Sequence, residues 1–270
     1  MQVLTGIRVV TMALNAPGPV AASHLRDAGA HVTKVEPPGG DPLAAVSPGW
    51  YGELHAGVTV ERLDLKATAG AARMRTLIAG ADLFLSSQRP SALQRLALDP
   101  ASLAADDTTH RVRTLNIVGE IARPEIAGHD LTYLAQAGLL GHEMPRALVA
   151  DILGAERAFA TALQLLREPP GTSALVGLFD SLAPLTAALR HGVTGPRALL
   201  GGGLPAYGIY DAKEGRVAIA ALEPHFQERL YRLLALPSGS DLTAMMGRRA
   251  AQEWEEWGVA HDVPICACRD

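Results

Sequence analysis

Lysine and cysteine are scarce in this chain of 270 residues, and neither sign of charge dominates. Lys34, Lys66 and Lys213 are the only lysines, and 24 Lys and Arg residues face 28 Asp and Glu residues, for a formal net charge of −4. A nucleic-acid binder needs a surplus of cations to neutralise phosphates, so this balance argues against one. We expect the partners to be small molecules or a second copy of the chain.

Only two cysteines occur, Cys266 and Cys268, and they are too close in the sequence for an unstrained disulfide. Such sparse cysteine usage is typical of a reducing compartment. Only His261 lies near them, so we expect no metal site. The N-terminal residues match neither a signal peptide nor an organelle address, and no apolar run reaches the roughly 18 to 20 residues of a membrane span. The sequence therefore predicts a cytoplasmic protein that does not span the membrane.

Three common catalytic signatures are also missing. The turn at residues 15–19 contains one glycine, where the dinucleotide fingerprint needs three, and Pro17 and Pro19 lack the backbone N–H groups that a pyrophosphate would use. There is no glycine-rich phosphate loop followed by Lys and Ser or Thr, and no Gly-x-Ser-x-Gly segment. These absences argue against a nicotinamide enzyme, an NTPase and the commonest type of hydrolase.

The residues that are present predict an α/β fold. Hydrophobic residues make up 48% of the sequence, which is enough for one large domain or two unequal ones. A β-branched run at residues 7–12, a helical segment at residues 19–28 and a second run at residues 31–35 form a strand–helix–strand pattern. Such a unit is right-handed and predicts a parallel sheet, with ligands bound outside the carboxyl ends of its strands.

Further elements continue the alternation of helices and strands. We expect helices at residues 67–79, 131–140, 155–166 and 180–190, and strands at residues 82–86, 112–118 and 173–179. Glycine and proline concentrate at residues 194–203, which predicts a boundary between a large domain (1–198) and a small one (199–270). The small domain is expected to contain a hairpin at residues 206–210 and 216–221, and helices at residues 224–236 and 242–257.

One polar cluster in an apolar setting has the residues for proton transfer. His129 and Asp130 open a predicted helix, where a carboxylate is stabilised as the anion and an adjacent imidazole can give or take a proton. Asp130 could equally serve only as the cap of that helix. The same two alternatives hold for Asp151 and Glu223, which each stand before a predicted helix.

Several segments, in this order, resemble CoA-transferase family III, the group that includes formyl-CoA transferase and α-methylacyl-CoA racemase. They are residues 4–10 (LTGIRVV), 16–19 (APGP), 28–41 (AGAHVTKVEPPGGD), 63–66 (LDLK), 81–84 (ADLF), 89–90 (RP), 128–133 (GHDLTY), 207–210 (YGIY), 221–226 (ALEPHF), 253–254 (EW) and 262–264 (DVP). The resemblance implies a Rossmann-like parallel-sheet large domain, a smaller α+β C-terminal domain and a homodimer. It also implies a CoA thioester as the substrate, with no permanently bound cofactor.

The resemblance implies roles for the polar candidates. Family transferases use an aspartate as the nucleophile that exchanges with the thioester, and that position is Asp130. Family racemases use a His and an Asp on opposite faces of the acyl α-carbon. Those positions are His129 and Asp151, with Glu223 as a supporting acid. The adjacent His and Asp, together with residues 222–226, look more like the racemase branch. We therefore expect racemisation or epimerisation at the α-carbon, with CoA transfer between carboxylic acids as the alternative.

The expected CoA-binding residues are Arg89, Gly18 and Pro19. Family members carry further cations toward the nucleotide end of CoA, where this chain has three uncharged residues, namely Ala44, Ala56 and Val58. Each lost charge-assisted contact costs about 1.5 to 3 kcal/mol of binding free energy. A non-catalytic homologue, or an enzyme that uses a different acyl carrier, therefore stays open as a third possibility.

Overall fold

The computed structural model describes residues 2–141 and 143–269, and it divides into two compact units that meet between Pro184 and Leu185. Each unit has its own hydrophobic core. The glycine-rich segment at residues 194–203 lies inside the second unit, so the boundary in the structure comes earlier than the predicted 198/199.

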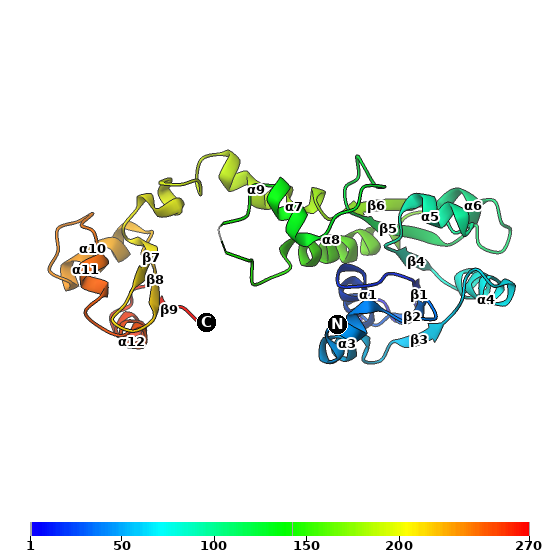
Figure 1. Ribbon diagram of the computed structural model, residues 1–270, viewed down its shortest axis with the longest axis horizontal. Coiled ribbons are helices and arrows are strands. Elements are labelled where there is room, and N and C mark those ends of the chain that lie inside the picture. The colour runs from blue at the N-terminus through cyan, green and yellow to red at the C-terminus, as the bar shows by residue number, and fades with distance from the viewer. Residues whose placement is uncertain (1, 142, 270) are drawn as a thin grey trace. The chain divides into compact units, whose positions relative to one another are not determined.

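The first unit is an α/β unit built on six parallel strands in the order β3-β2-β1-β4-β5-β6 (Figure 1). The strands are β1 (Arg8–Thr11), β2 (His31–Glu36), β3 (Thr59–Arg62), β4 (Leu83–Ser86), β5 (Arg113–Val118) and β6 (Ser173–Gly177). The helices are α1 (Pro17–Asp27), α2 (Pro42–Val46), α3 (Pro48–His55), α4 (Thr68–Ala79), α5 (Pro90–Arg95), α6 (Pro100–Ala104), α7 (Asp130–Gln136) and α8 (Val149–Leu165), followed by the 3₁₀ turn η1 (Asp180–Leu182). The predicted Rossmann-like parallel sheet is confirmed.

Both faces of the sheet are buried, which is why its central strands are almost continuously apolar. Successive side chains of a strand point to opposite faces. Val9 and Leu83 therefore join the core that includes α1 and α8, while Val10 and Phe84 join the core on the α4 side. Helix α8 presents four alanines with no exposed surface to the first core, at positions 150, 155, 158 and 162. These small side chains let α8 pack closely beside α1.

Some elements differ from the sequence-based expectation. Strand β3 was not predicted because its residues, TVER, are mostly exposed at the edge of the sheet and lack an apolar pattern. Helix α8 begins at Val149, six residues before the predicted start, which places Asp151 in its first turn. The short helices α2, α3, α5 and α6 were also not predicted. Each begins with a proline in its first turn, which the missing N–H of proline tolerates there.

The second unit is a small α+β unit. Its strands β7 (Tyr207–Asp211), β8 (Arg216–Ala220) and β9 (Ile265–Ala267) form an antiparallel sheet, which confirms the expected hairpin and adds a third strand. Its helical elements are α9 (Ala183–Arg190), which begins at the boundary, η2 (Leu199–Gly203), α10 (Pro224–Leu233), α11 (Thr243–Met246) and α12 (Ala251–His261). Trp254 is buried in the core, and its indole N–H donates to the carbonyl of Met246 at 2.8 Å. Within residues 2–141 and 143–269, no helix is long and apolar enough to cross a membrane.

The contact between α1 and the end of β1 gives the first testable prediction. A Cβ atom at Gly18 would lie 2.1 Å from the Cβ of Ala13, so only glycine fits between the helix and the strand. We expect Gly18→Ala to lower the free energy of unfolding by about 1 to 3 kcal/mol through overpacking. Urea unfolding followed by circular dichroism measures this. In the control Gly52→Ala, the new methyl meets open space within α3, and stability should stay the same or rise.

Candidate active site

A cavity of about 240 Å³ opens at the carboxyl ends of the central strands. The strand order reverses between β1 and β4, and ligands of open α/β sheets bind at such a point. The segments that follow β1, β4, β5 and β6 supply most of the wall, and the starts of α7 and α8 complete it. Its lining includes Leu14, Asn15, Gln88, Arg89, Gly119, Gly128, His129, Tyr133 and Asp151.

Two of the predicted catalytic residues, His129 and Asp151, line this cavity together. His129 is the residue before the first turn of α7, and its backbone is fixed there by Thr132. The His129 N–H donates to the Thr132 hydroxyl at 3.0 Å, and that hydroxyl donates back to the His129 carbonyl at 2.8 Å. The imidazole itself stays exposed at the rim.

Asp130 turns away from the cavity, although it follows His129 directly. Its side chain is 5% exposed, and its Oδ1 accepts the backbone N–H of Asp151 at 3.0 Å. The carboxylate thus caps α8, a neighbouring helix, and not its own helix as the local sequence suggested. The negative charge of Asp130 is favourable at the N-terminus of α8, where the helix dipole is positive. This single bond joins the starts of α7 and α8 and brings His129, Asp130 and Asp151 together.

Asp151 has a pKa raised from 3.8 to about 6. Burial contributes most to this shift, and the negative charge of Asp130 adds to it, while the charge of His129 opposes it. At neutral pH both protonation states of Asp151 are therefore accessible. Such a carboxyl group in a cavity, next to a histidine, is suited to give and to take protons.

Tyr133 forms part of the cavity wall and explains two nearby glycines. Its side chain is 7% exposed, and burial, followed by the charges of Asp151 and Glu120, raises the pKa of its hydroxyl. A Cβ atom at Gly119 would lie 2.2 Å from the Tyr133 hydroxyl oxygen, and one at Gly128 would lie 2.5 Å from its ring. Both glycines therefore make room for the Tyr133 side chain. Gly119 follows β5 and lies far from Tyr133 in the sequence, so the sequence pattern did not reveal this contact.

A second, more apolar cavity of about 510 Å³ lies at the ends of β1, β2 and β3. It shares Leu14 and Gln88 with the first cavity. Arg89 lines the first cavity and Lys66 lines the second, and CoA binding by Arg89 stays a prediction. Lys66 is part of the LDLK motif, but no role was predicted for it from the sequence. The scarcity of lysine could have pointed to it, since Lys66 is one of only three lysines in the sequence.

The other predicted CoA-binding residues lie behind the cavity wall. Gly18 and Pro19 are buried within α1, and the first cavity is lined instead by Pro17. Their contact with CoA stays a prediction. The three positions that lack family cations, Ala44, Ala56 and Val58, line neither of these two cavities.

Glu223 belongs to the second unit. It is the residue before the first turn of α10, its side chain is exposed, and it makes no capping hydrogen bond there. Its role as a supporting acid stays a prediction.

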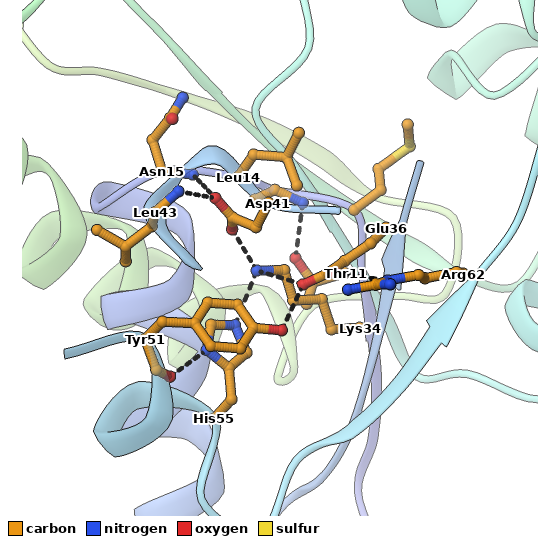
Figure 2. Close-up of polar contacts among 12 residues, drawn as sticks. Thr11, Leu14, Asn15, Lys34, Glu36, Asp41, Leu43, Tyr51, His55 and Arg62 are labelled. Carbon is orange, nitrogen blue, oxygen red and sulfur yellow. Dashed lines mark hydrogen bonds and ion pairs between the residues drawn. The ribbon is translucent and has the colours of Figure 1, made fainter. Parts of the chain in front are cut away.

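One group of side chains has the donor atoms for a metal ion. Atoms of Glu36, Asp41 and His55 lie within 4.8 Å of one another. The Lys34 ammonium lies among them, 2.5 Å from Asp41 Oδ2, 2.7 Å from His55 Nε2 and 3.4 Å from Glu36 Oε1 (Figure 2). A metal ion there would meet the positive charge of Lys34, so the residues do not fit a metal site while Lys34 is charged.

The model of CoA-transferase family III matches residues 4–270. The chain belongs to this family. A CaiB/BaiF CoA-transferase family protein of Caenorhabditis elegans is 28% identical over 91% of this chain and 76% of its own length. Human alpha-methylacyl-CoA racemase is 30% identical over 94% of this chain and 69% of its own length. A succinyl-CoA:(R)-benzylsuccinate CoA-transferase subunit of Thauera aromatica is 34% identical over 46% of this chain and 33% of its own length.

A solved structure supports the fold. A hypothetical protein of Mycobacterium tuberculosis matches with a TM-score of 0.86 at 20% identity, covering 100% of this chain and 86% of its own. The relatives by sequence include both a racemase and CoA-transferases, so family membership establishes a connection to CoA thioester chemistry but not which reaction occurs.

The charges around Asp151 give the second prediction. Asp130→Asn should lower the pKa of Asp151 below about 6, because it removes a repelling carboxylate while its amide oxygen can still accept the Asp151 N–H. His129→Gln should shift that pKa upward, because it removes a group that stabilises the Asp151 anion. Carboxyl ¹³C NMR titration measures both shifts. If the two variants moved the pKa in the same direction, this account of the site would be wrong.

Proposed function

We propose that this protein is an acyl-CoA racemase or epimerase that moves the α-proton of a CoA thioester. The observation that carries the proposal is the pairing of His129 and Asp151 in one cavity, while Asp130 faces the backbone of α8. A proton-transfer enzyme needs two such groups facing its substrate. A transferase needs an accessible carboxylate nucleophile, and Asp130 is 5% exposed.

The reaction follows from the chemistry of the thioester. One residue of the pair removes the α-proton, and the electrons of the broken C–H bond form an enolate whose negative charge rests on the thioester oxygen. The other residue, in its protonated form, returns a proton to the opposite face of the α-carbon. This requires one group to be protonated while the other is not. The pKa of Asp151, about 6, keeps both of its states within reach at neutral pH.

The two cavities, which share Leu14 and Gln88 in their walls, can take the two ends of a CoA thioester. We place the acyl group and the thioester in the first cavity, beside His129 and Asp151, and the nucleotide in the larger apolar cavity. Arg89 and Lys66 are then the cations that meet the phosphates. CoA acts here as part of the substrate, and dimer formation and a cytoplasmic location stay predictions.

CoA transfer between carboxylic acids is the second candidate function. The observation that favours it is the position of Asp130 beside His129 at the start of α7, together with the CoA-transferases among the relatives. In that reaction the Asp130 carboxylate attacks the thioester carbonyl and releases the CoA thiolate, which requires Asp130 to leave the Asp151 N–H.

Solvent-deuterium exchange separates the two functions and is the third prediction. With a panel of (R)- and (S)-2-methylacyl-CoA thioesters in D₂O, the wild type should incorporate deuterium at the α-carbon, detected by mass spectrometry. Because each residue of the pair handles the α-proton, His129→Gln and Asp151→Asn should each reduce the exchange rate by about 100-fold or more. Asp130→Asn should retain most of the exchange.

The experiment includes one control variant and a test for the alternative reaction. Asp99→Asn changes an aspartate that caps α6, a helix that does not line the first cavity, and should leave the exchange rate unchanged. Absence of α-deuterium with the wild type on every substrate would overturn the racemase proposal. If the wild type also moved CoA between carboxylic acids and Asp130→Asn abolished this, the transferase function would replace it.

Binding of CoA itself gives the fourth prediction. Titration calorimetry with CoA and acetyl-CoA should show binding, and Arg89→Ala and Lys66→Ala should each weaken it by about tenfold, because each removes one charge-assisted contact. The control is Arg75→Ala, which removes an exposed cation of α4 that pairs with Asp106. A wild type that binds neither compound would favour the non-catalytic homologue or a different acyl carrier.

A further inference from the structure

A group of polar side chains, three of them buried and charged, lies beside the candidate active site and plays no part in the proposed proton transfers. It consists of Lys34, Glu36, Asp41, Tyr51 and His55, hereafter the Lys34 cluster (Figure 2). Lys34 and Glu36 belong to β2, Asp41 caps α2, and Tyr51 and His55 are one turn apart on α3. The exposed fraction is 1% for Lys34, 1% for Glu36 and 3% for Asp41.

The hydrogen bonds of the Lys34 cluster fix the ammonium group in one place. His55 Nδ1 lies 2.6 Å from the carbonyl of Tyr51, so this nitrogen carries the proton and Nε2 accepts from the Lys34 ammonium at 2.7 Å. Burial lowers the pKa of His55, which keeps the ring neutral. The Tyr51 hydroxyl donates to Glu36 Oε1 at 2.7 Å. The Lys34 ammonium is thus directed at Asp41 Oδ2, 2.5 Å away.

Such a cluster is weak evidence for a stabilising role. Removing two carboxylates and an ammonium from water costs several kcal/mol per ion, and their attraction does little more than offset it. The other contacts of Asp41 indicate what the cluster holds. Asp41 Oδ1 accepts two backbone N–H groups, from Leu43 at 2.9 Å and from Asn15 at 3.1 Å.

The bond to Asn15 connects the Lys34 cluster to the first cavity. Asn15 lies in the turn between β1 and α1 and has a φ of +66°, a left-handed conformation that costs a non-glycine residue about 1 to 2 kcal/mol. Strained backbone of this kind persists where surrounding contacts hold it, and it is concentrated at functional sites. Asn15 and Leu14 line the same cavity as His129 and Asp151.

We propose that Asp41, clamped by Lys34, is a positioning residue that holds the Leu14–Asn15 turn in the shape with which it lines the cavity of the proton-transfer pair. The inference rests on the proposed function for its catalytic consequence, and on the two bonds of Asp41 for its structural one. Lys34 fixes the carboxylate through Oδ2, and Oδ1 fixes the turn. Asp41 therefore acts on the substrate only through Asn15 and its neighbours.

The chain contains a matched control for this role. Asp99 caps α6 just as Asp41 caps α2: both are followed by proline, and both accept N–H groups of their own first turn. Asp99 accepts from Ala101 and Ser102 and holds no segment of the first cavity. Asp41→Ala and Asp99→Ala should therefore both lose a helix cap, while only the first should release the turn.

The test, our fifth prediction, compares these variants in two measurements. In backbone amide NMR of the ligand-free protein, Asp41→Ala should shift the resonances of Leu14, Asn15 and the cavity residue Gly119, and Asp99→Ala should not. In the α-deuterium exchange assay, Asp41→Ala should lower kcat by about 10- to 100-fold with less than about threefold change in KM, because small displacements in an active site are this costly. Asp41→Asn keeps an oxygen for both N–H groups but turns its amide NH2 toward the Lys34 ammonium, so it should recover only part of the kcat.

A second pair of variants keeps the inference testable if Asp41→Ala does not fold. Asn15→Gly and Asn15→Val both remove the amide side chain, but only glycine adopts a positive φ without cost. Asn15→Val should have a kcat at least about tenfold below that of Asn15→Gly. An Asp41→Ala protein with wild-type kcat and unshifted cavity resonances, or equal kcat for the two Asn15 variants, would overturn the inference. If the resonances shift but the wild type shows no exchange on any substrate, the positioning role stands and the proposed function fails.

Discussion

The hydrogen bond from the Asp151 N–H to the Asp130 carboxylate is the contact on which the candidate site depends. It ties the start of α7 to the start of α8, two helices whose first residues are separated by a long connection in the sequence. Because α7 begins directly after His129, the same bond brings the imidazole and the Asp151 carboxyl group to one cavity. It also places one carboxylate near another, which contributes to the raised pKa of Asp151.

Two parts of the cavity wall are held in the same manner. Asp130 accepts a backbone N–H at the start of α8, and Asp41 accepts the backbone N–H of Asn15. In both places a buried carboxylate satisfies a backbone donor that would otherwise lack a partner. A parallel sheet ends its strands in loops, which have few backbone partners of their own. Carboxylates held by neighbouring elements can give such loops a single shape.

The sequence was sufficient for the parts of the fold that depend on local patterns. The β-branched runs around Val9 and Val32 and the breakers after them predicted the first strand–helix–strand unit, and the order of short motifs identified the family. Strand β3 was not predicted because an edge strand needs no alternation of apolar and polar residues. The start of α8 was predicted too late because its first turn is capped by Asp130, a residue outside the helix that no local pattern connects with it.

The candidate site was predictable in its residue types but not in its contacts. His129, Asp130 and Asp151 were all singled out, and for Asp130 the sequence offered a choice between catalysis and capping its own helix. The structure shows instead a cap on another helix, a contact between segments that no local pattern specifies. The role of Lys34 was hidden for the same reason, since its partners Asp41 and His55 come from different helices.

The raised pKa of Asp151 lowers the stability of the folded protein at neutral pH, and such a loss is typical of groups in functional sites. A carboxyl group with a pKa of about 6 in the folded chain and about 3.9 in the unfolded chain binds more protons when folded between these values. Below about pH 4 the group is protonated in both states and the shift costs nothing, whereas the cost grows as the pH rises and is almost complete above about pH 6. At neutral pH this shift of about two pKa units costs the folded protein about 3 kcal/mol, since each unit corresponds to about 1.4 kcal/mol. A buried Asp151 that served packing alone would be replaced by an uncharged residue without this loss. Its presence beside His129, in a cavity at the reversal point of the sheet, is consistent with the proton transfer that we propose.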